Sequence, residues 1–481
     1  MSNITEYEPK RVFHYFNEIS KIPHGSYNTA AMTKFLVDFA KAQGLEYIEE
    51  EIGNVIIKKP ASPGYEKSAP ILLQGHMDMV CTVAPGCTKD MTKEGLDLVV
   101  DGDWLTAEGT TLGGDDGAAV AYMLALAESD EFQHPALELV FTVDEETGLE
   151  GADAIDTDHL AARKMINLDS EEEGIITVSC AGGITGKAHL PIKREEKEGE
   201  LCTLTIGGLK SGHSGTDINL ELGNANILMG RVLYDLSKVT EVSLISMAGG
   251  NADNVICQEC VAEIIVSDTE KLASEIDRLD AVLKNEYKTS DPGVFVKAEL
   301  EGVCRKAATD ADSTRRVLAY LMTAPYGVQN MSMDIKDLTE TSLNLGALKL
   351  EEDEMTALYA LRSSVMTRQA YLQDKLTLAC EAQGGTVEYS FFYPAWEFRK
   401  DSPLRDVCVK VYQEMFGKEP LVEAIHAGLE CGIFAGKMGG EFDAVSIGPQ
   451  MVAVHTADEK LSISSTKRTW EYLLEILKES K

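Results

Sequence analysis

A histidine and an aspartate two residues apart end the first strongly apolar run of this chain. Residues 71–80 read ILLQGHMDMV, which predicts a buried strand with His76 and Asp78 at its carboxyl end. Because residues i and i+2 of a strand point to the same side, both side chains face the edge where open α/β sheets bind ligands. A zinc-bound histidine often passes its second N–H to a carboxylate. A hydrogen-bonded strand end uses the same residue types, so the pair alone does not establish a metal site.

Further carboxylates and a second histidine occur at comparable positions. They are Asp115 at the start of an apolar helix, Glu145 and Glu146 after the strand 137–143, Asp169 after the strand 164–168, and His455 after the strand 443–447. A plain helix cap would account for Asp115 taken alone, and a solvated strand end for each of the others. Consecutive acids repel one another unless a cation offsets them. The repetition of this pattern over several strands therefore favours one shared site.

These residues suit a pair of metal ions. The two imidazoles and three carboxylates expected as ligands are those of His76, Asp115, Glu146, Asp169 and His455. Such a donor set fits borderline divalent ions, with zinc as the first expectation and cobalt or manganese as alternatives. Three carboxylates and one hydroxide balance two dications, whereas a single ion would leave excess negative charge in a buried cleft. We expect Asp115, in a tight glycine-flanked turn, to bridge the two ions.

A pair of ions would need a general base beside it. Water that bridges two metals about 3.5–4 Å apart becomes a hydroxide near neutral pH, and one metal polarises the carbonyl that it attacks. The base must move the water's proton to the leaving amine. Glu145, next to the ligand Glu146 but free of metal, fits this task. Asp78 would orient His76 through a hydrogen bond.

Two kinds of segment must position these side chains. Helices and strands alternate over residues 1–185 and again over 396–481, which predicts a doubly wound α/β domain with a mixed sheet. Over residues 186–395 their order approximates the split βαββαβ arrangement twice. We therefore expect a catalytic domain in two parts, interrupted by an inserted α+β lid domain of two ferredoxin-like halves.

Composition narrows the class of protein. The 481 residues include 44 Lys and Arg against 79 Asp and Glu, a formal net charge of −35, which argues against binding nucleic acid. The chain shows no basic-then-apolar leader and no apolar run of about 18 residues, so we expect no membrane segment. The ten cysteines are scattered, which favours a reduced protein of the cytoplasm. The CxxC spacing of Cys257 and Cys260 lacks the second pair that a zinc knuckle would need.

Short sequence motifs occur over essentially the whole chain, and their order is highly specific. They are GHMDMV, TLGGDDG, VDEETG, NLDSEEEG, CAGG at 180–183, GLKSGHSG at 208–215, GGNADN at 249–254, ETSLNLG at 340–346 and HAGLECG at 426–432. In these motifs the chain resembles the M20 metallopeptidases, and within them the cytosolic aminoacyl-histidine (Xaa-His) or non-specific dipeptidases. The resemblance implies the same ligands, Glu145 as the base, Asp78 as the catalytic aspartate, and the same lid. It also implies a cis peptide at Asp115–Asp116, and dipeptidase or aminopeptidase rather than carboxypeptidase activity from Asp169.

The resemblance adds candidate substrate contacts in the inserted domain. His213 resembles the family's oxyanion-stabilising histidine, although by itself it would pass for a surface-turn residue. Such a donor is worth about 3–4 kcal/mol in comparable sites. Asn254 and Arg362 are expected to contact the substrate's backbone and terminal carboxylate, and His426 to line the pocket. The chain departs from the family pattern at Asp253, where relatives often carry His.

The sequence thus predicts a metal-dependent dipeptidase. It would hydrolyse unblocked dipeptides, including Xaa-His, as a monomer or as a homodimer through the lid, with small dipeptides as its only expected partners. An N-acyl amino acid deacylase on the same di-metal scaffold remains an alternative. A non-enzymatic acidic protein with a relic site is a third, against which the complete set of ligands and catalytic carboxylates argues.

Overall fold

The computed structural model describes residues 4–481, which separate by their internal contacts into two compact units. Unit 1 comprises Met1–Cys180, Phe398–Ala424 and Leu429–Lys481. Unit 2 comprises Ala181–Glu397 and Ile425–Gly428, so that part of the HAGLECG motif belongs to each unit. The assignment of functional domains to 1–185, 186–395 and 396–481 stays a prediction.

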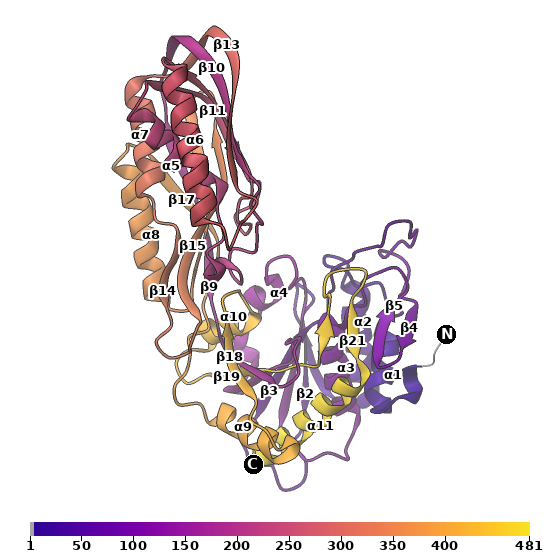
Figure 1. Ribbon diagram of the computed structural model, residues 1–481. Helices are drawn as coiled ribbons and strands as arrows, with labels where there is room; N and C mark the ends of the chain where they lie inside the picture. The colour runs from indigo at the N-terminus through magenta and orange to yellow at the C-terminus, as the bar shows by residue number, and fades with distance from the viewer. Residues whose placement is uncertain (1–3) are drawn as a thin grey trace. The chain divides into compact units, whose positions relative to one another are not determined.

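An eight-stranded mixed sheet forms the centre of unit 1 (Figure 1). In spatial order its strands are β1 (Glu46–Glu49), β2 (Val55–Lys59), β6 (Leu137–Thr142), β3 (Ile71–His76), β7 (Lys164–Asn167), β19 (Asp443–Ser446), β8 (Ile175–Cys180) and β18 (Leu421–Ile425). β3 runs parallel to both β6 and β7, and β7 runs parallel to β19. β2 pairs antiparallel with β1 and with β6, so the mixed sheet predicted from the sequence is confirmed.

Helices cover both faces of this sheet. The helices of unit 1 are η1 (Ile4–Glu6), α1 (Lys10–Ile19), α2 (Ala30–Gln43), α3 (Gly114–Glu128), α4 (Glu150–Ala154), η2 (Thr157–His159), α9 (Pro403–Phe416), α10 (Glu430–Met438) and α11 (Ile463–Glu479). Gln74 of β3 hydrogen-bonds to Glu430 of α10, whereas a Cβ added to Gly75 would lie 2.6 Å from Ala119 of α3. Because successive strand residues point to opposite faces, α3 and α10 lie on opposite sides of the sheet.

The helix α3 is almost completely buried, as its apolar sequence predicted. Every residue from Gly114 to Ala127 is buried, as expected from an apolar composition on all sides. α3 also packs against α1, and its Tyr122 stacks on Trp470 of α11 with ring centroids 5.8 Å apart. This burial fixes the turn that leads into the helix, where Asp115 lies.

A small sheet that the sequence did not predict completes unit 1. Its strands, in spatial order, are β20 (Met451–Val452), β21 (Lys460–Ser462), β5 (Trp104–Ala107) and β4 (Leu98–Asp101). These strands have two to four residues, too few to show a two-residue period of apolar and polar side chains. The loop between β20 and β21 carries His455.

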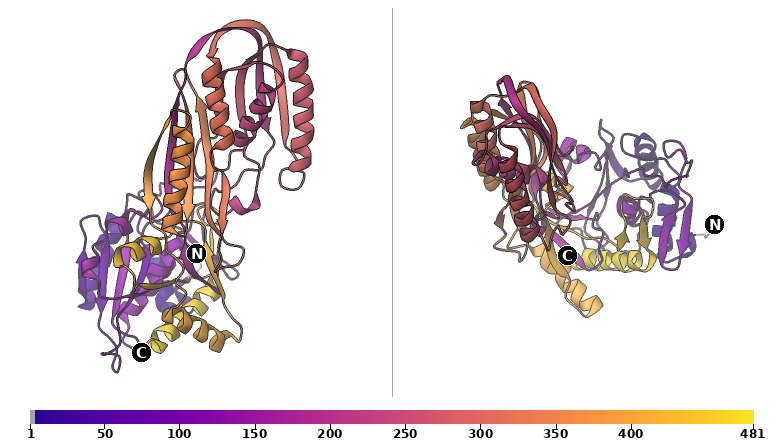
Figure 2. Two further views of the ribbon diagram at one scale, coloured as in Figure 1. Left: turned by 90° about the vertical axis from the view of Figure 1, so that its left-hand side faces the viewer. Right: turned by 45° about the horizontal axis from the view of Figure 1, so that its top comes forward.

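Unit 2 contains one antiparallel sheet of nine strands. Its main path is β13 (Phe295–Thr309), β10 (Arg194–Gly207), β12 (Cys260–Val266), β11 (Val242–Gly249), β15 (Thr339–Leu350), β16 (Glu354–Ser363), β9 (Gly182–Pro191) and β17 (Thr386–Tyr393), and β14 (Gly327–Met331) pairs with β15. The helices of unit 2 are η3 (Ile218–Leu220), α5 (Ala225–Ser237), α6 (Thr269–Glu286), α7 (Ala311–Thr323) and α8 (Met366–Glu381). The four α-helices lie on one face of the sheet (Figure 2).

The sheet of unit 2 consists of two halves with the same strand order. In the first half β10, α5, β11, β12, α6 and β13 follow one another, and in space the fourth strand lies beside the first. The second half repeats this order with β9 as its first strand, followed by α7, β15, β16, α8 and β17. Each half therefore has the ferredoxin-like βαββαβ arrangement. The first half is inserted between the first strand and the first helix of the second, which the sequence pattern did not reveal.

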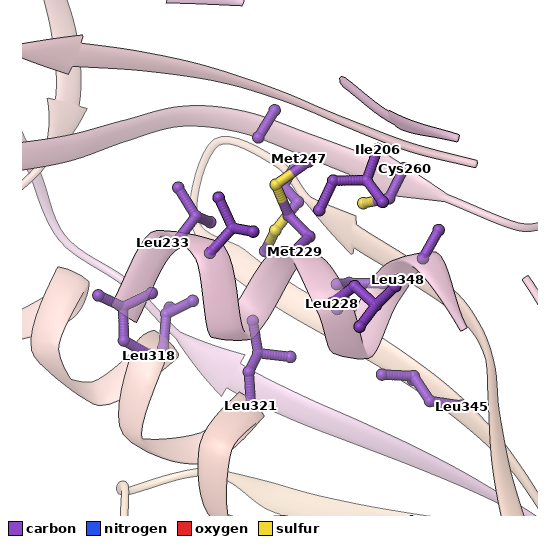
Figure 3. Close-up of a cluster of buried hydrophobic side chains, with 14 of the residues drawn as sticks. Ile206, Leu228, Met229, Leu233, Met247, Cys260, Leu318, Leu321, Leu345 and Leu348 are labelled. Carbon is purple, nitrogen blue, oxygen red and sulfur yellow. The ribbon is translucent and has the colours of Figure 1, made fainter. Parts of the chain in front are cut away.

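The core of unit 2 lies between the sheet and its helices. Figure 3 shows Leu228, Met229 and Leu233 of α5 packed between the strands and Leu318 and Leu321 of α7. All five side chains are buried. The two halves join where β11 pairs with β15 through three residue pairs, so the core is continuous across them.

Among the described residues, no helix is both long and apolar enough to cross a lipid bilayer.

Candidate active site

The strand ends of unit 1 bring the expected metal ligands together. His76 is the last residue of β3, Glu146 lies in the loop after β6, and Asp169 follows β7 by two residues. Because β6, β3 and β7 are parallel neighbours, their carboxyl ends meet at one edge of the sheet. Asp115 reaches this edge from the turn before α3, and His455 from the loop after β20.

Asp115 lies between the two histidines. Its Oδ1 is 3.0 Å from His76 Nε2, and its Oδ2 is 3.1 Å from His455 Nε2. His76 Nε2 is also 3.7 Å from an Asp169 oxygen, and His455 Nε2 is 3.0 Å from Glu146 Oε1. One carboxylate with an oxygen toward each of two such groups is the arrangement that a bridging ligand requires.

The donor atoms form three groups, in each of which they lie within 4.8 Å of one another. The groups are His76, Asp116 and Asp169; His76, Glu145 and Glu146; and Asp115, Glu146 and His455. Asp116 was not expected among them. Its Oδ2 accepts a hydrogen bond from His76 N at 3.2 Å, and its Oδ1 is buried without a partner in the described part of the chain.

The electrostatics of the cluster fit divalent cations. Burial raises the pKa of Asp169, and the charge of Asp115 adds to this effect. Burial likewise raises the pKa of Asp116 and of Glu145. Hydrogen bonds with Asp115 and Glu146 raise the pKa of His455 to about 11. Two imidazoles do not neutralise this many buried carboxylates, so the site fits added positive charge.

Asp78 connects two of the chain segments that carry these groups. Its Oδ1 accepts the backbone N–H of Glu145 at 3.0 Å, and its Oδ2 accepts the hydroxyl of Ser26 at 2.8 Å. His76 Nδ1 lies 3.0 Å from the backbone oxygen of Asp78 and 3.5 Å from its carboxylate. Although burial acts in the opposite direction, the interactions with His76 and Ser26 lower the pKa of Asp78. Asp78 thus orients His76 mainly through its backbone oxygen, while its carboxylate holds the loop of Glu145.

Glu145 and Glu146 differ in their side-chain contacts. The Glu146 carboxylate accepts from His455, whereas that of Glu145 makes no hydrogen bond to any residue between 4 and 481. Glu145 Oε and His76 nonetheless belong to one donor group. A carboxylate close to the ligands and without its own partner is free to exchange a proton.

The peptide bond between Asp115 and Asp116 is cis, as the resemblance implied. Neither residue has helical φ and ψ, so the regular helix begins after them.

The sequence did not single out two buried glutamates beside this site. Glu459 accepts hydrogen bonds from the backbone N–H groups of Leu112, Gly113 and Gly114. Glu430 accepts from Thr142 Oγ1 at 3.0 Å and from Gln74, and burial raises its pKa to about 7. Glu459 had no local signal, because the backbone groups that it binds lie far away in the sequence.

The expected substrate contacts His213 and Asn254 lie side by side within unit 2. Ser214 N donates to Asn254 O at 2.8 Å, and His213 forms an isolated bridge with Val255. Asn344, in the ETSLNLG motif, donates to Asp253 O and Val255 O at 2.8 Å each and so fixes the loop on both sides of Asn254.

Arg362 and His426 are buried in the same unit. Arg362 Nη1 donates to Tyr393 Oη at 2.7 Å, and its Nε has no partner in the described part of the chain. His426 Nε2 is 2.7 Å from Ser342 Oγ, while its Nδ1 is buried and has no partner among residues 4–481. Burial, and then the charges of Arg362 and His213, lower the pKa of His426 to about 3. Polar atoms buried without partners indicate a place where a polar ligand can bind.

Comparison with known proteins places this geometry in a family. A sequence model described as Peptidase family M20/M25/M40 matches residues 72–479. The chain is 36% identical over 484 residues to the cytosol non-specific dipeptidase of Escherichia coli (strain K12), covering 100% of this chain and 99% of that protein.

Solved structures agree with the sequence match. The aminoacylhistidine dipeptidase from Vibrio alginolyticus superposes with a TM-score of 0.93 and 33% identity, covering 99% of this chain and 98% of that one. The aminopeptidase PepT from Bacillus cereus superposes with a TM-score of 0.58 and 17% identity over 98% and 99% of the two chains, which shows a shared fold.

Proposed function

Because this chain belongs to peptidase family M20/M25/M40, we propose that it is a metal-dependent dipeptidase that hydrolyses unblocked dipeptides, Xaa-His dipeptides included. The observation that carries the proposal is the position of Asp115 between His76 and His455. The Glu145 carboxylate lies beside them and has no hydrogen-bond partner in the described part of the chain. The complete set of donors does not favour a non-enzymatic scaffold.

The proposed cofactor is two divalent ions, zinc first and cobalt or manganese as alternatives. The residues that would hold them are His76, Asp115, Glu146, Asp169 and His455. When bound, such ions acidify water and polarise a carbonyl oxygen. The mixture of imidazole and carboxylate donors is the chemistry that these metals prefer.

Glu145 is the proposed general base and Asp78 its positioning partner. Burial raises the pKa of the Glu145 carboxyl, which brings it closer to the range where it can both accept and release a proton. In the reaction it takes the proton of the attacking water and returns it to the leaving amine. Asp78 holds the backbone of Glu145 and so keeps this carboxylate at the edge of the ligand cluster.

His213 is the proposed donor to the oxyanion. Its Nδ1 accepts the backbone N–H groups of Gly215 and Thr216, at 3.3 and 3.2 Å, so in the neutral ring the proton is on Nε2. Burial, followed by the charge of Arg362, lowers the pKa of His213 and favours that neutral form. The ring therefore offers Nε2–H to a developing negative charge.

Arg362 is the proposed partner of the substrate's terminal carboxylate, and Asn254 that of its backbone. Arg362 is 9% exposed, and its Nε is buried without a hydrogen-bond partner among the described residues. A buried guanidinium without an anion is costly, so an anionic ligand is expected there. Replacing Arg362 by Met should raise KM about 10–100-fold for dipeptides with a free carboxylate.

Dipeptide amides provide the control for this variant. Because they lack the carboxylate, Arg362→Met should change their KM little relative to wild type. An equal loss on both substrate types would count against the assignment.

A substrate panel tests the proposed activity directly. Purified protein reconstituted with zinc should hydrolyse free dipeptides with kcat/KM at least about 100-fold above that for the same dipeptides carrying an N-acetyl group. The reason is that a site shaped for the free N-terminus rejects a blocked one. The opposite preference, with N-acyl amino acids as the better substrates, would support the deacylase alternative, which the two full-length relatives do not favour.

We further propose that the protein acts in the cytoplasm on small peptides, without nucleic acid or membrane partners. That it is a monomer, or a homodimer through the inserted domain, stays a prediction. Light scattering would test it by measuring the molar mass in solution.

A further inference from the structure

The loop that carries His455 is strained and half exposed. The His455 side chain is 50% exposed, whereas that of His76 is 1% exposed. Ala453 and His455 have φ values of 54° and 65°, in the left-handed region that residues with a Cβ rarely adopt. Such a backbone persists only where surrounding groups hold it. The loop between β20 and β21 therefore depends on an anchor.

Glu459, at the end of this loop, makes the most extensive attachment. The residue is 2% exposed, and its carboxylate accepts three backbone N–H groups, from Leu112 at 2.8 Å, Gly113 at 3.2 Å and Gly114 at 2.8 Å. These groups lie in the turn that leads into the regular part of α3. Asp115 comes directly after them. One carboxylate thus joins the loop of His455 to the turn of Asp115.

Apart from the contacts of the His455 ring with Asp115 and Glu146, which belong to the proposed ligand set, the loop has two further side-chain attachments. Thr82 Oγ1 donates to His455 O at 3.0 Å, and Thr106 Oγ1 donates to Glu459 O at 2.8 Å. Each is a single bond between neutral groups, and hydrogen bonds to a charged acceptor are about twice as strong. Glu459 supplies three of the latter kind.

We infer that Glu459 is a positioning residue that completes one of the two metal positions and not the other. The inference rests on the proposed ligand set. Position A is defined by His76, Asp115 and Asp169, and position B by Asp115, Glu146 and His455. Position B is complete only while the loop of His455 is docked on the turn of Asp115.

Position A has support that does not involve Glu459. His76 and Asp169 are carried by β3 and β7, which pair directly. The turn of Asp115 is attached to β3 separately, because Asp116 Oδ2 accepts the backbone N–H of His76 at 3.2 Å. Loss of the Glu459 contacts releases His455 and leaves these connections in place. The two ions are then expected to bind in sequence, first at A and then at B.

The variant Glu459→Gln tests this role with little change of shape. An amide has one acceptor oxygen, and its NH₂ group would face N–H donors, so the three bonds are not all kept. Calorimetric titration of the full-length apoprotein with zinc should give two ions for wild type. The variant should bind one ion with wild-type affinity and the second about 10–100-fold more weakly. Its dipeptidase activity should fall at limiting zinc and return in excess zinc.

Glu138 offers a matched control in the same unit. It is also a buried glutamate that accepts backbone N–H groups, from Ala161 at 2.9 and 3.1 Å and from Ala162 at 3.0 Å, but it lies in the first half of β6, away from the ligand edge. Glu138→Gln should lower thermal stability and leave both affinities for zinc unchanged.

The outcomes separate the possibilities. Two wild-type affinities in Glu459→Gln, or equal weakening of both ions, would overturn the inference. Fewer than two ions in wild type would contradict the proposed ligand set itself. If Glu459→Gln does not fold, Glu459→Asp keeps the charge on a shorter side chain, and the same selective weakening of the second ion is expected from it.

Discussion

Replacing Glu145 by Gln should lower kcat by about 10²–10⁴-fold while both metal ions stay bound. The amide keeps the size of the side chain but cannot accept a proton at neutral pH. Glu145 is not needed to hold metal in our assignment, since its neighbour Glu146 faces His455 and its own carboxylate has no partner among residues 4–481. Steady-state kinetics on a free dipeptide, combined with metal analysis of the same sample, measure both parts of the prediction.

The control for this variant is Glu150→Gln. Glu150 is an exposed acid that follows the same loop and accepts a hydrogen bond from Tyr27 Oη at 2.8 Å. Its replacement should leave kcat within about twofold of wild type, as expected for a surface substitution. Wild-type turnover in Glu145→Gln would remove Glu145 from the mechanism, and loss of metal would make it a ligand instead.

Replacing Asp115 by Asn should remove activity by a different route. Asp115 has one oxygen 3.0 Å from His76 Nε2 and the other 3.1 Å from His455 Nε2, so it is the one proposed ligand shared by both ions. The neutral amide keeps one oxygen and loses the charge. We expect metal content to fall well below two ions per chain, and turnover to fall on the order of 10⁴-fold or more.

Asp103→Asn is the matched control for the metal content. Asp103 also belongs to unit 1, and its carboxylate accepts from Ser462 Oγ at 2.6 Å and Ser464 Oγ at 2.7 Å. It lies outside all three donor groups. Elemental analysis should find wild-type metal in this variant, and wild-type metal in Asp115→Asn would show that another residue bridges the ions.

In unit 1 the sequence predicted the strands and strand ends that have a clear local pattern of apolar and polar residues. Apolar strands that end in His76, Glu146 and Asp169 could be recognised because parallel strands place their ends together whatever the loops do. His455 could be added because it follows the last such strand. Glu459 could not, since a buried acid that binds backbone N–H groups far away in the sequence has no local signature.

In unit 2 the order of helices and strands predicted two similar halves. It did not predict that one half is inserted into the other. The first strand of the second half, β9, comes before the whole first half, and the sequence pattern did not reveal this. Pairings between segments this distant leave no periodicity to read. The roles of His213, Asn254 and Arg362 came from the family motifs, and the hydrogen bonds around them are compatible with those roles without testing them.

The nested arrangement of unit 2 has a consequence for how such a chain can change. The ends of the first half meet, because Asp310 N donates to Lys193 O at 2.9 Å and Arg194 pairs with Thr309. The segment from β10 to β13 is therefore an insertion whose two ends are adjacent in space. Its loss or gain would require no longer linker between β9 and α7. His213 and Asn254 lie inside this inserted segment, and Arg362 lies outside it. A single in-frame insertion or deletion of the segment would therefore add or remove two of the three proposed substrate contacts.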